Sequence, residues 1–303
     1  MPTPQSTHRL TPFVRLKMAA PKTRWFDWLF LTLQFWRDHK RLPRQFGGTL
    51  NDAYFYINTS DAILDPVRVF VSDKALVKEY VAAKVGAEHN VETLAVLDSF
   101  GAARNFDYPD DCVIKPTHMS GEVIMRQRGS VVDLDVLRRW FKSSYYDSSR
   151  EANYSHLRRR VIVEPYIFGR KSVEDFKIFC LRGRPLVVQV DFDRHTNHTQ
   201  NLYTTDWQLL PFAITCPVGP GFPRPRNLAQ LLDIAARLSD EFSLIRVDLY
   251  TDGESILVGE ITNLHQSGRG RFMPASGEGI MSKIFFGDTG FQPMLLEPPG
   301  PSV

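Results

Sequence analysis

The sequence predicts an α+β protein rather than a doubly wound parallel sheet. Two pairs of apolar runs, 176–181 with 186–192 and 244–250 with 256–261, are separated by short polar turns, which is typical of β-hairpins. Helical periods, most clearly at 227–242, occur without a regular alternation of strand and helix. The 303 residues suffice for one large domain or for a few closely apposed lobes.

The first half is expected to be mainly helical, with short strands after residue 90. An aromatic-rich stretch predicts a helix over 23–40, which Pro43 would end. The segment 50–86 also has helical character, with Ser72 as the N-cap of a helix over 73–85. Short β runs at 93–97, 112–115 and 122–126 precede a helix that starts at Asp133.

The second half is expected to be richer in strands. A strand at 161–167 precedes the first hairpin, and Asn227 is expected to cap the helix over 227–242. The residues from Gly287 onward lack apolar periodicity and are expected to be mobile. These features divide the chain into an N-terminal helical extension 1–48, a helical or α+β subdomain 49–110, two lobes 111–168 and 169–286, and a tail 287–303.

Positive charge is concentrated at the N-terminus, where residues 1–45 carry nine Lys and Arg against two Asp. Together with the aromatic run 25–36, this basic head could lie on an anionic membrane surface or a lipid-linked substrate. Alternatively, it forms an accessory helix whose apolar side packs on the main body. The rest of the chain is slightly acidic and has no nucleic-acid-binding motif, so no nucleic-acid partner is expected.

No apolar run is long enough to span a bilayer, and the N-terminus does not have the pattern of a secretory signal. We therefore expect a cytoplasmic protein, which the basic head could bring to the inner face of the cell membrane. The oligomeric state cannot be predicted.

Asp248 and Glu260 are carboxylates inside otherwise apolar strands. Their burial is costly unless positive charge neutralises them, and hard divalent cations take oxygen ligands of this kind. Both side chains share a face if an odd-length loop pairs Asp248 opposite Val258, because side chains alternate along a strand. Alternatively, Asp248 pairs with Arg246 on the same face, and Glu260 is a surface residue at a strand end.

Lys115 ends a strand candidate and is followed by a short loop, Pro-Thr-His-Met-Ser-Gly, before the next β run. A lysine beside the backbone amides of such a loop can bind phosphate oxygens. The loop matches neither the Walker sequence nor the dinucleotide-binding fingerprint. A hairpin turn with an exposed lysine is the alternative.

A third group of polar residues surrounds the first hairpin. Asp175 and Lys177 share one strand face, and Gln189 and Asp191 are expected to share another on the partner strand. Arg194, just beyond, could stabilise charge on a transferred phosphoryl group or an acyl oxygen.

Taken together, these pieces resemble the ATP-grasp superfamily, and more closely its TupA-like branch, named for a teichuronopeptide biosynthesis protein and often found among polysaccharide genes. The resemblance runs from about residue 50 to residue 286. Nine short motifs carry it, and their order makes the resemblance specific. They begin at Ser72, Leu97, Val113, Val163, Asp175, Val190, Pro225, Arg246 and Gly259.

The resemblance implies an ATP-grasp fold, in which two α+β lobes clasp a nucleotide, and it implies ATP and Mg²⁺ as cofactors. Residues 111–168 would form the small lobe with its phosphate loop, and 169–286 the large lobe with its metal site. Lys74 and Lys115 would contact the ATP phosphates. The loop that contains His118, Ser120 and Gly121 would close over them.

The remaining implied roles concern the nucleotide and the reaction. Glu164 and Tyr166 would contact the nucleotide from the strand and hinge that join the lobes. Asp175 and Lys177 would lie beside the nucleotide, and Lys177 would share a catalytic role with Arg194, which would steady the γ-phosphate.

In the same pattern, Asp248 and Glu260 would hold magnesium. Thr262 stands where many relatives have an asparagine ligand, and Asn263 comes one residue later. Strand alternation puts Thr262, rather than Asn263, on the side of the ion.

The implied activity is ATP- and Mg²⁺-dependent formation of a C–N bond, with release of ADP and phosphate, through an acyl phosphate. It would modify a sugar acid or amino acid in surface-polysaccharide biosynthesis, so the partners would be a small-molecule or lipid-linked glycan acceptor and an amine donor. The same phosphate and metal groups would serve a sugar or glycan kinase. A third possibility is a non-catalytic nucleotide-binding component of a glycan assembly complex.

Overall fold

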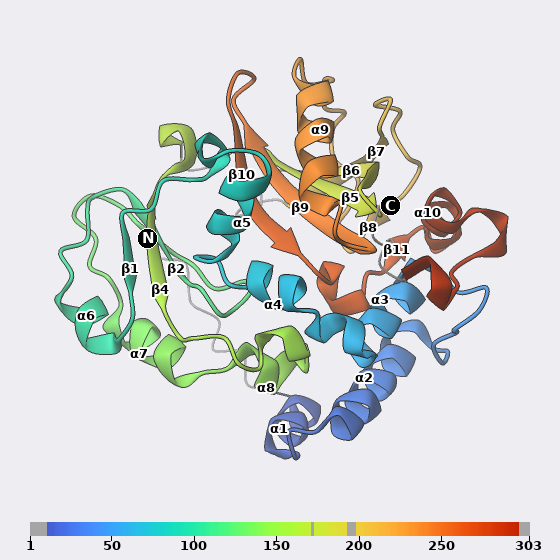
Figure 1. Ribbon diagram of the computed structural model, residues 1–303, viewed down its shortest axis with the longest axis horizontal. Coiled ribbons are helices and arrows are strands. Elements are labelled where there is room, and N and C mark those ends of the chain that lie inside the picture. Colours follow the sequence, from blue (N-terminus) through green and yellow to red (C-terminus); the bar gives the residue numbers. More distant parts are fainter. Residues whose placement is uncertain (1–10, 171–172, 193–197, 297–303) are drawn as a thin grey trace.

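The computed structural model describes residues 11–170, 173–192 and 198–296. Two main sheets lie in the two halves of the molecule, and the first helices run along one edge (Figure 1). All pairings between the named strands are antiparallel, which confirms the α+β prediction. Among the described residues, no helix has the length and apolar character needed to cross a bilayer.

The smaller lobe is a four-stranded sheet in the order β1-β4-β2-β3 with two helices. Its elements are β1 (Ala95–Leu97), α6 (Phe100–Asn105), β2 (Cys112–Pro116), β3 (Ile124–Arg126), α7 (Leu134–Lys142) and β4 (Val161–Pro165). The Asp133 side chain accepts hydrogen bonds from two backbone amides of the first turn of α7, so the expected helix start is confirmed. Leu137 and Trp140 of α7 pack on Ile114 and Val163 of the sheet.

The larger lobe is a five-stranded sheet in the order β10-β9-β5-β6-β7. Its elements are β5 (Asp175–Leu181), β6 (Arg184–Phe192), β7 (Thr199–Thr204), α9 (Leu228–Ser239), β9 (Leu244–Thr251) and β10 (Ile256–Thr262). Both expected hairpins are present, β5 with β6 and β9 with β10. A separate two-stranded ribbon pairs β8 (Ala213–Ile214) with β11 (Phe272–Met273).

Side-chain alternation gives this large sheet two unlike faces. One face is apolar, and its Ile178, Val190 and Val247 pack with Leu231 of α9 in one core cluster. The other face carries polar side chains at the ends of β5, β9 and β10. Farther along the strands, the same face carries Phe179 and other apolar residues. The sheet therefore buries one face fully and leaves a polar region on the other for a site.

The helix expected over 73–85 is shorter than predicted, because α5 (Val77–Lys84) begins only after a turn at 73–76, and a separate helix, α4 (Pro66–Ser72), precedes that turn. Ser72 ends α4, and its hydroxyl donates to the carbonyl oxygen of Arg68, so its predicted role as N-cap is wrong. The Asp73 carboxylate accepts from the amides of Ala75 and Leu76 and turns the chain. Lys74 therefore lies in the turn between α4 and α5.

The N-terminal helices are α1 (Pro12–Ala19), α2 (Arg24–His39) and α3 (Leu50–Thr59), of which α1 was not predicted. The buried Arg150, after α8 (Tyr145–Ser149), fastens the first two. Its guanidinium donates to Asp27 at 3.2 Å and to the carbonyl oxygens of Pro21 and Ala20 at 3.0 Å each. One side of the N-terminal extension thus packs on the body.

The C-terminal segment is more ordered than predicted. After α10 (Gly277–Phe286), the chain returns to the body, and the fully buried Phe291 exchanges backbone hydrogen bonds with Gly48. Leu296 is also buried. The expectation of a mobile tail from Gly287 is therefore wrong for 287–296, because two apolar side chains anchor this stretch, and residues 297–303 lie outside the described part.

Candidate active site

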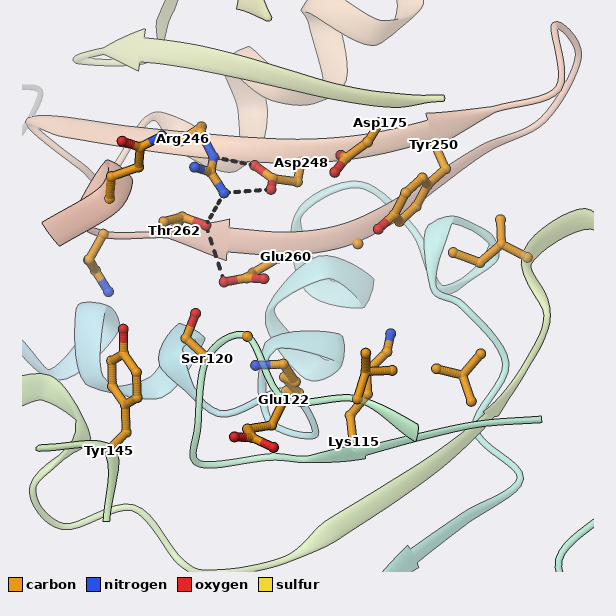
Figure 2. A pocket seen from close by; sticks show the side chains of 18 of the residues that line it. Lys115, Ser120, Glu122, Tyr145, Asp175, Arg246, Asp248, Tyr250, Glu260 and Thr262 are labelled. Atoms are coloured by element: carbon orange, nitrogen blue, oxygen red, sulfur yellow. Dashed lines mark hydrogen bonds and ion pairs between the residues drawn. The ribbon is translucent and has the colours of Figure 1, made fainter. Parts of the chain in front are cut away.

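A cavity of about 560 Å³ opens between the two lobes, and most of the residues expected in the site line it. Figure 2 shows one wall formed by β9 and β10 and the facing wall formed by the β2–β3 hairpin. The expected residues on the walls are Lys74, Lys115, Ser120, Gly121, Tyr166, Asp175, Asp248, Glu260 and Thr262. Residues from both halves of the chain therefore meet at one place.

Asp248 on β9 and Glu260 on β10 are direct partners across the ladder. The loop between the strands holds four residues, 252–255, and this even number alone would place Glu260 on the opposite face. A bulge between Val258 and Glu260 adds one residue, Gly259, and restores the shared face. The expected odd-length loop and the pairing of Asp248 with Val258 are therefore wrong, although the two carboxylates do share a face.

Arg246 links this pair through a chain of hydrogen bonds (Figure 2). Its guanidinium donates to both carboxylate oxygens of Asp248, at 2.6 and 2.7 Å. It also donates to the hydroxyl of Thr262 at 3.0 Å, and that hydroxyl donates to Glu260 at 3.2 Å. The sequence left two alternatives, a shared face for the two carboxylates or an ion pair between Asp248 and Arg246. The structure contains both.

The two carboxylates differ in their electrostatic surroundings. Burial, together with the negative charge of Asp175, raises the pKa of Asp248 to about 6, although the charge of Arg246 opposes the shift. Removal from water also acts to raise the pKa of Glu260, but the positive charges of Lys74 and Arg246 hold it below its usual value. Glu260 is therefore a carboxylate that stays ionised at neutral pH.

Asp248, Glu260 and Thr262 offer two carboxylates and a hydroxyl, which are hard oxygen donors of the kind that a divalent cation accepts. The pKa of Asp248 is raised chiefly because its carboxylate is buried away from water, and a bound cation would offset that cost. In the described part of the chain, no three His, Cys, Asp or Glu side chains are grouped to hold an ion by themselves. The donors thus fit a cation that keeps water or ligand oxygens in its shell.

The facing wall supplies the positive charge. Lys115 ends in an ion pair of 2.8 Å with Glu164, which also accepts from Lys78 at 2.7 Å. The two lysines hold the pKa of the buried Glu164 below its usual value, against the effect of burial. Glu164 is not among the residues that line the cavity, so its contact with a nucleotide stays a prediction. Its ion pair positions the side chain of Lys115.

Lys74 holds the loop that follows β2. Its ammonium group donates to the carbonyl oxygen of Met119 at 2.6 Å, next to Ser120 and Gly121 on the cavity wall. Gly121 has a φ of +82°, a left-handed conformation that few other residues adopt. Glu122 anchors the far side of the loop by accepting from the indole N–H of Trp140 at 3.0 Å. The loop therefore presents backbone groups and small side chains to the cavity.

The structure corrects the expectation for His118. Its side chain is buried and makes a 3.1 Å hydrogen bond with the carbonyl oxygen of Trp140 in the small lobe. Burial lowers the pKa of this imidazole, which favours its neutral form. The side chain therefore supports the loop from below and does not reach the cavity with Ser120 and Gly121.

Lys177 lies between two acidic side chains of the large sheet. It is buried on β5, where its ammonium group contacts Asp175 and donates to Asp191 at 2.7 Å. The strand register puts Asp175 opposite Asp191 and Lys177 opposite Gln189, so the two polar sets share one face rather than two. Asp175 lines the cavity, whereas Lys177 is not among its lining residues and neutralises Asp175 and Asp191. Its expected place beside the nucleotide and its catalytic role stay predictions.

The remaining expected residues are Tyr166 and Arg194. Tyr166 lines the cavity just after β4, and its hydroxyl donates to the carbonyl oxygen of Arg126 at 2.8 Å. This bond ties the connection between the lobes to the β3 strand. Arg194 lies outside the described residues, and its catalytic role stays a prediction.

The cavity is also lined by a group of residues that were not predicted from the sequence, namely Tyr145, Glu151, Tyr154, Gln266 and Ser267. Ser267 donates to Glu151 at 2.5 Å, and burial raises the pKa of Glu151 to about 7. Gln266 and Ser267 have φ angles of 48° and 56°, which is a strained conformation for two consecutive residues other than glycine. No motif marks these residues, because they come from the short helix α8, from two short 3-10 helices at 152–154 and 265–268, and from the residue before the first of these.

Comparisons with solved structures found likenesses of low identity. A D-alanine–D-alanine ligase from Bacillus anthracis complexed with ATP is 15% identical, with 76% of this chain and 61% of that chain covered and a TM-score of 0.36. The D-alanine–D-alanine ligase from Helicobacter pylori is 13% identical, with 73% of this chain and 56% of that chain covered and a TM-score of 0.38. The ATP-grasp ligase PsnB, complexed with a phosphomimetic variant of minimal precursor, Mg and ADP, is 9% identical. The match covers 72% of this chain and 55% of that chain, with a TM-score of 0.40.

The chain therefore spans less than two thirds of the length of these solved proteins. A comparison with curated proteins found no match. The model of the TupA-like ATP-grasp family matches residues 60–286, a span that holds both lobes and all the described residues of the cavity wall named above. The resemblance expected from the nine motifs is confirmed, and the chain belongs to the TupA-like ATP-grasp family.

Proposed function

We propose that the protein is an ATP- and Mg²⁺-dependent ligase that joins a carboxylate to an amine. The observation that supports this most is that two lysines and two carboxylates line one cavity. Lys74 and Lys115 line it together with Asp248 and Glu260, and Lys115 lies across it from the two carboxylates (Figure 2). A triphosphate carries negative charge that the lysines would neutralise, and the carboxylates would hold the cation that it brings. Membership of the family supports the same assignment.

The residues of this chain have distinct parts in the proposal. Lys74 and Lys115 would bind phosphate oxygens, and the backbone of Ser120 and Gly121 would lie against them. Asp248, Glu260 and Thr262 would hold Mg²⁺, which supplies charge neutralisation for phosphoryl transfer. Tyr166 and the residues around it would border the nucleotide from the connection between the lobes.

The proposed reaction has two steps. A carboxylate oxygen of the acceptor attacks the γ-phosphorus of ATP, and the bond to the bridging oxygen of ADP breaks. An amine then attacks the acyl carbon, phosphate leaves, and the nitrogen loses a proton. Arg194 would stabilise the charge of the transferred group. The family resemblance supports a sugar acid or amino acid of a surface polysaccharide as the acceptor.

Product analysis tests the proposal. The protein is incubated with ATP, Mg²⁺ and a panel of sugar acids and amines, each carboxylate alone, each amine alone and each pair. Ligation predicts that ADP, free phosphate and an amide appear only with a matching pair. A phosphorylated acceptor that forms without an amine would assign the site to a kinase. ATP binding without turnover on any member of the panel would favour a binding component over a ligase.

A further inference from the structure

The helix α2 (Arg24–His39) has two apolar sides, and only one of them packs on the protein. Trp25, Trp28, Leu33 and Trp36 are 61%, 47%, 44% and 54% exposed. At 100° per residue they fall within one stripe on the helix surface. Three exposed tryptophans on one helix are unusual for a surface that faces only water, because each leaves a large apolar ring hydrated.

The opposite side of the same helix already has its partners. Asp27, Phe30, Leu31, Gln34 and Phe35 are buried there. Asp27 accepts from the hydroxyl of Tyr146 at 2.9 Å and from Arg150 at 3.2 Å, and Gln34 accepts from Lys17 at 3.1 Å. The exposed tryptophan stripe, which we define as Trp25, Trp28, Leu33 and Trp36, is therefore not needed to hold α2 in place.

Positive charge surrounds the stripe. Residues 11–48 contain eight Lys and Arg against two Asp. Lys22 precedes the helix and Lys40 follows it, and both are exposed, although Lys22 also pairs with Asp147 at 2.6 Å. The ammonium group of Lys40 lies 5.9 Å from the centre of the Trp36 ring. Arg15, on the neighbouring α1, is exposed as well. Cations at both ends of an apolar stripe complement an anionic surface that is apolar beneath its charged layer.

We propose that the tryptophan stripe and its flanking cations dock the protein on the surface of an anionic lipid bilayer. Tryptophan rings favour the depth of the lipid headgroups, and lysine and arginine are attracted to anionic lipids at the same depth. The helix would lie in the plane of the interface, with its packed side toward the protein. Tryptophan is also enriched at protein–protein interfaces, so binding of a second copy of the chain is an alternative outcome of the test.

Docking would also fix the orientation of the cavity. Arg150, which holds α1 and α2, is followed directly by Glu151 of the cavity wall. In Figure 1, α1 and α2 lie together at the edge of the molecule opposite α9. A short connection through Arg150 and Glu151 thus joins the docking helix to the cavity, independently of which reaction takes place there.

The test uses the full chain with vesicles of neutral phosphatidylcholine and vesicles that contain 30% anionic phosphatidylglycerol, about one lipid in three. The test variant carries Trp25→Gln, Trp28→Gln and Trp36→Gln together, which leaves the buried side of α2 unchanged. The control variant carries Val131→Gln and Leu209→Gln, at positions 93% and 52% exposed on other surfaces. Circular dichroism and thermal unfolding establish that all proteins are folded.

Co-sedimentation is expected to show binding of the wild type and the control to the anionic vesicles, and binding weaker by about tenfold or more for the test variant. Three of the five tryptophans lie on the stripe, so bound wild type should also show a blue shift of its fluorescence. Equal sedimentation of wild type and test variant, or no binding of the wild type, would overturn the proposal. Loss of self-association in the test variant without any vesicle binding would assign the stripe to a second copy instead.

Discussion

Asp248 and Glu260 face each other across β9 and β10 because of a single inserted residue, Gly259. Without this bulge, the four-residue loop between the strands would direct Glu260 to the opposite, apolar face of the sheet. Bulges of this kind often re-aim a side chain beside an active site. The cation-binding character of the cavity wall therefore depends on one backbone irregularity.

The bulge itself can be tested with Gly259→Ala. A methyl group at this position would lie 2.4 Å from an atom of the Tyr250 ring, so the ring or the bulge must move. We expect the free energy of unfolding to fall by about 1–3 kcal/mol and nucleotide binding to weaken. Gly279→Ala in α10 is the control, since its methyl group meets nothing within 4 Å and alanine favours helix. A Gly259→Ala protein as stable as the control would contradict the tight packing of Tyr250.

Lys115→Ala tests the positive wall. The substitution removes a charge that would bind phosphate, while Glu164 keeps its ion pair of 2.7 Å with Lys78, so the fold should persist. We expect the Kd for ATP to rise about tenfold or more, the scale of one charge-assisted contact, and turnover to be lost. Lys142→Ala, an exposed lysine of α7, serves as the control. Unchanged ATP affinity, measured by calorimetry, would remove Lys115 from the site.

Glu151 provides a pH-dependent test of stability. Its pKa is about 7 in the folded protein, against 4.5 in the unfolded chain. Between these two values the unfolded chain loses its proton while the folded protein keeps it, so the wild type loses stability as the pH rises. Glu151→Gln removes this loss and should retain the hydrogen bond from Ser267.

Urea unfolding at pH 5 and pH 8 measures the effect. From the lower to the higher pH, the wild type should lose about 1–3 kcal/mol relative to Glu151→Gln. Glu254→Gln, in an exposed turn, should follow the wild type at both pH values. If the stability of the wild type and of Glu151→Gln changed equally between the two pH values, the pKa of Glu151 would not be raised by folding.

The attachment of the N-terminal helices is tested by Asp27→Ala. The Asp27–Arg150 ion pair is buried on both sides, and removing the carboxylate leaves the guanidinium without its charged partner. We expect a loss of about 3–5 kcal/mol, the usual result of breaking a buried pair. The matched control is Asp135→Ala, which breaks a surface pair with Arg138 and should change stability much less. Equal changes in thermal unfolding would contradict a stabilising role for the buried Asp27–Arg150 pair.

Local patterns were sufficient to predict both hairpins, the long helices and the family. The hairpins were evident because alternating apolar residues flank polar turns, as at 182–183 and 252–255. The carboxylates of β9 and β10 were found because acidic residues in apolar strands are conspicuous. The position of Lys115 before its loop was equally local.

Features that depend on tertiary contacts were beyond such patterns. No sequence motif marks the bulge at Gly259. Its effect on the strand register can be seen only when β9 and β10 are paired in the structure. The burial of Lys177 between Asp175 and Asp191, and of His118 beneath α7, depends on neighbours from other elements. Glu151 lines the cavity, but it comes from a segment whose sequence has no helical or strand periodicity that would predict its place.

The most direct test of the proposed site is the calorimetric affinity for a non-hydrolysable ATP analogue, with and without Mg²⁺. Wild type is expected to bind the analogue more tightly when Mg²⁺ is present. Glu260→Gln should lose most of this gain and keep its affinity in the absence of the ion, because the amide no longer attracts the cation while the lysines remain. A wild type indifferent to Mg²⁺, or a Glu260→Gln protein that keeps the full gain, would contradict a cation site on this wall.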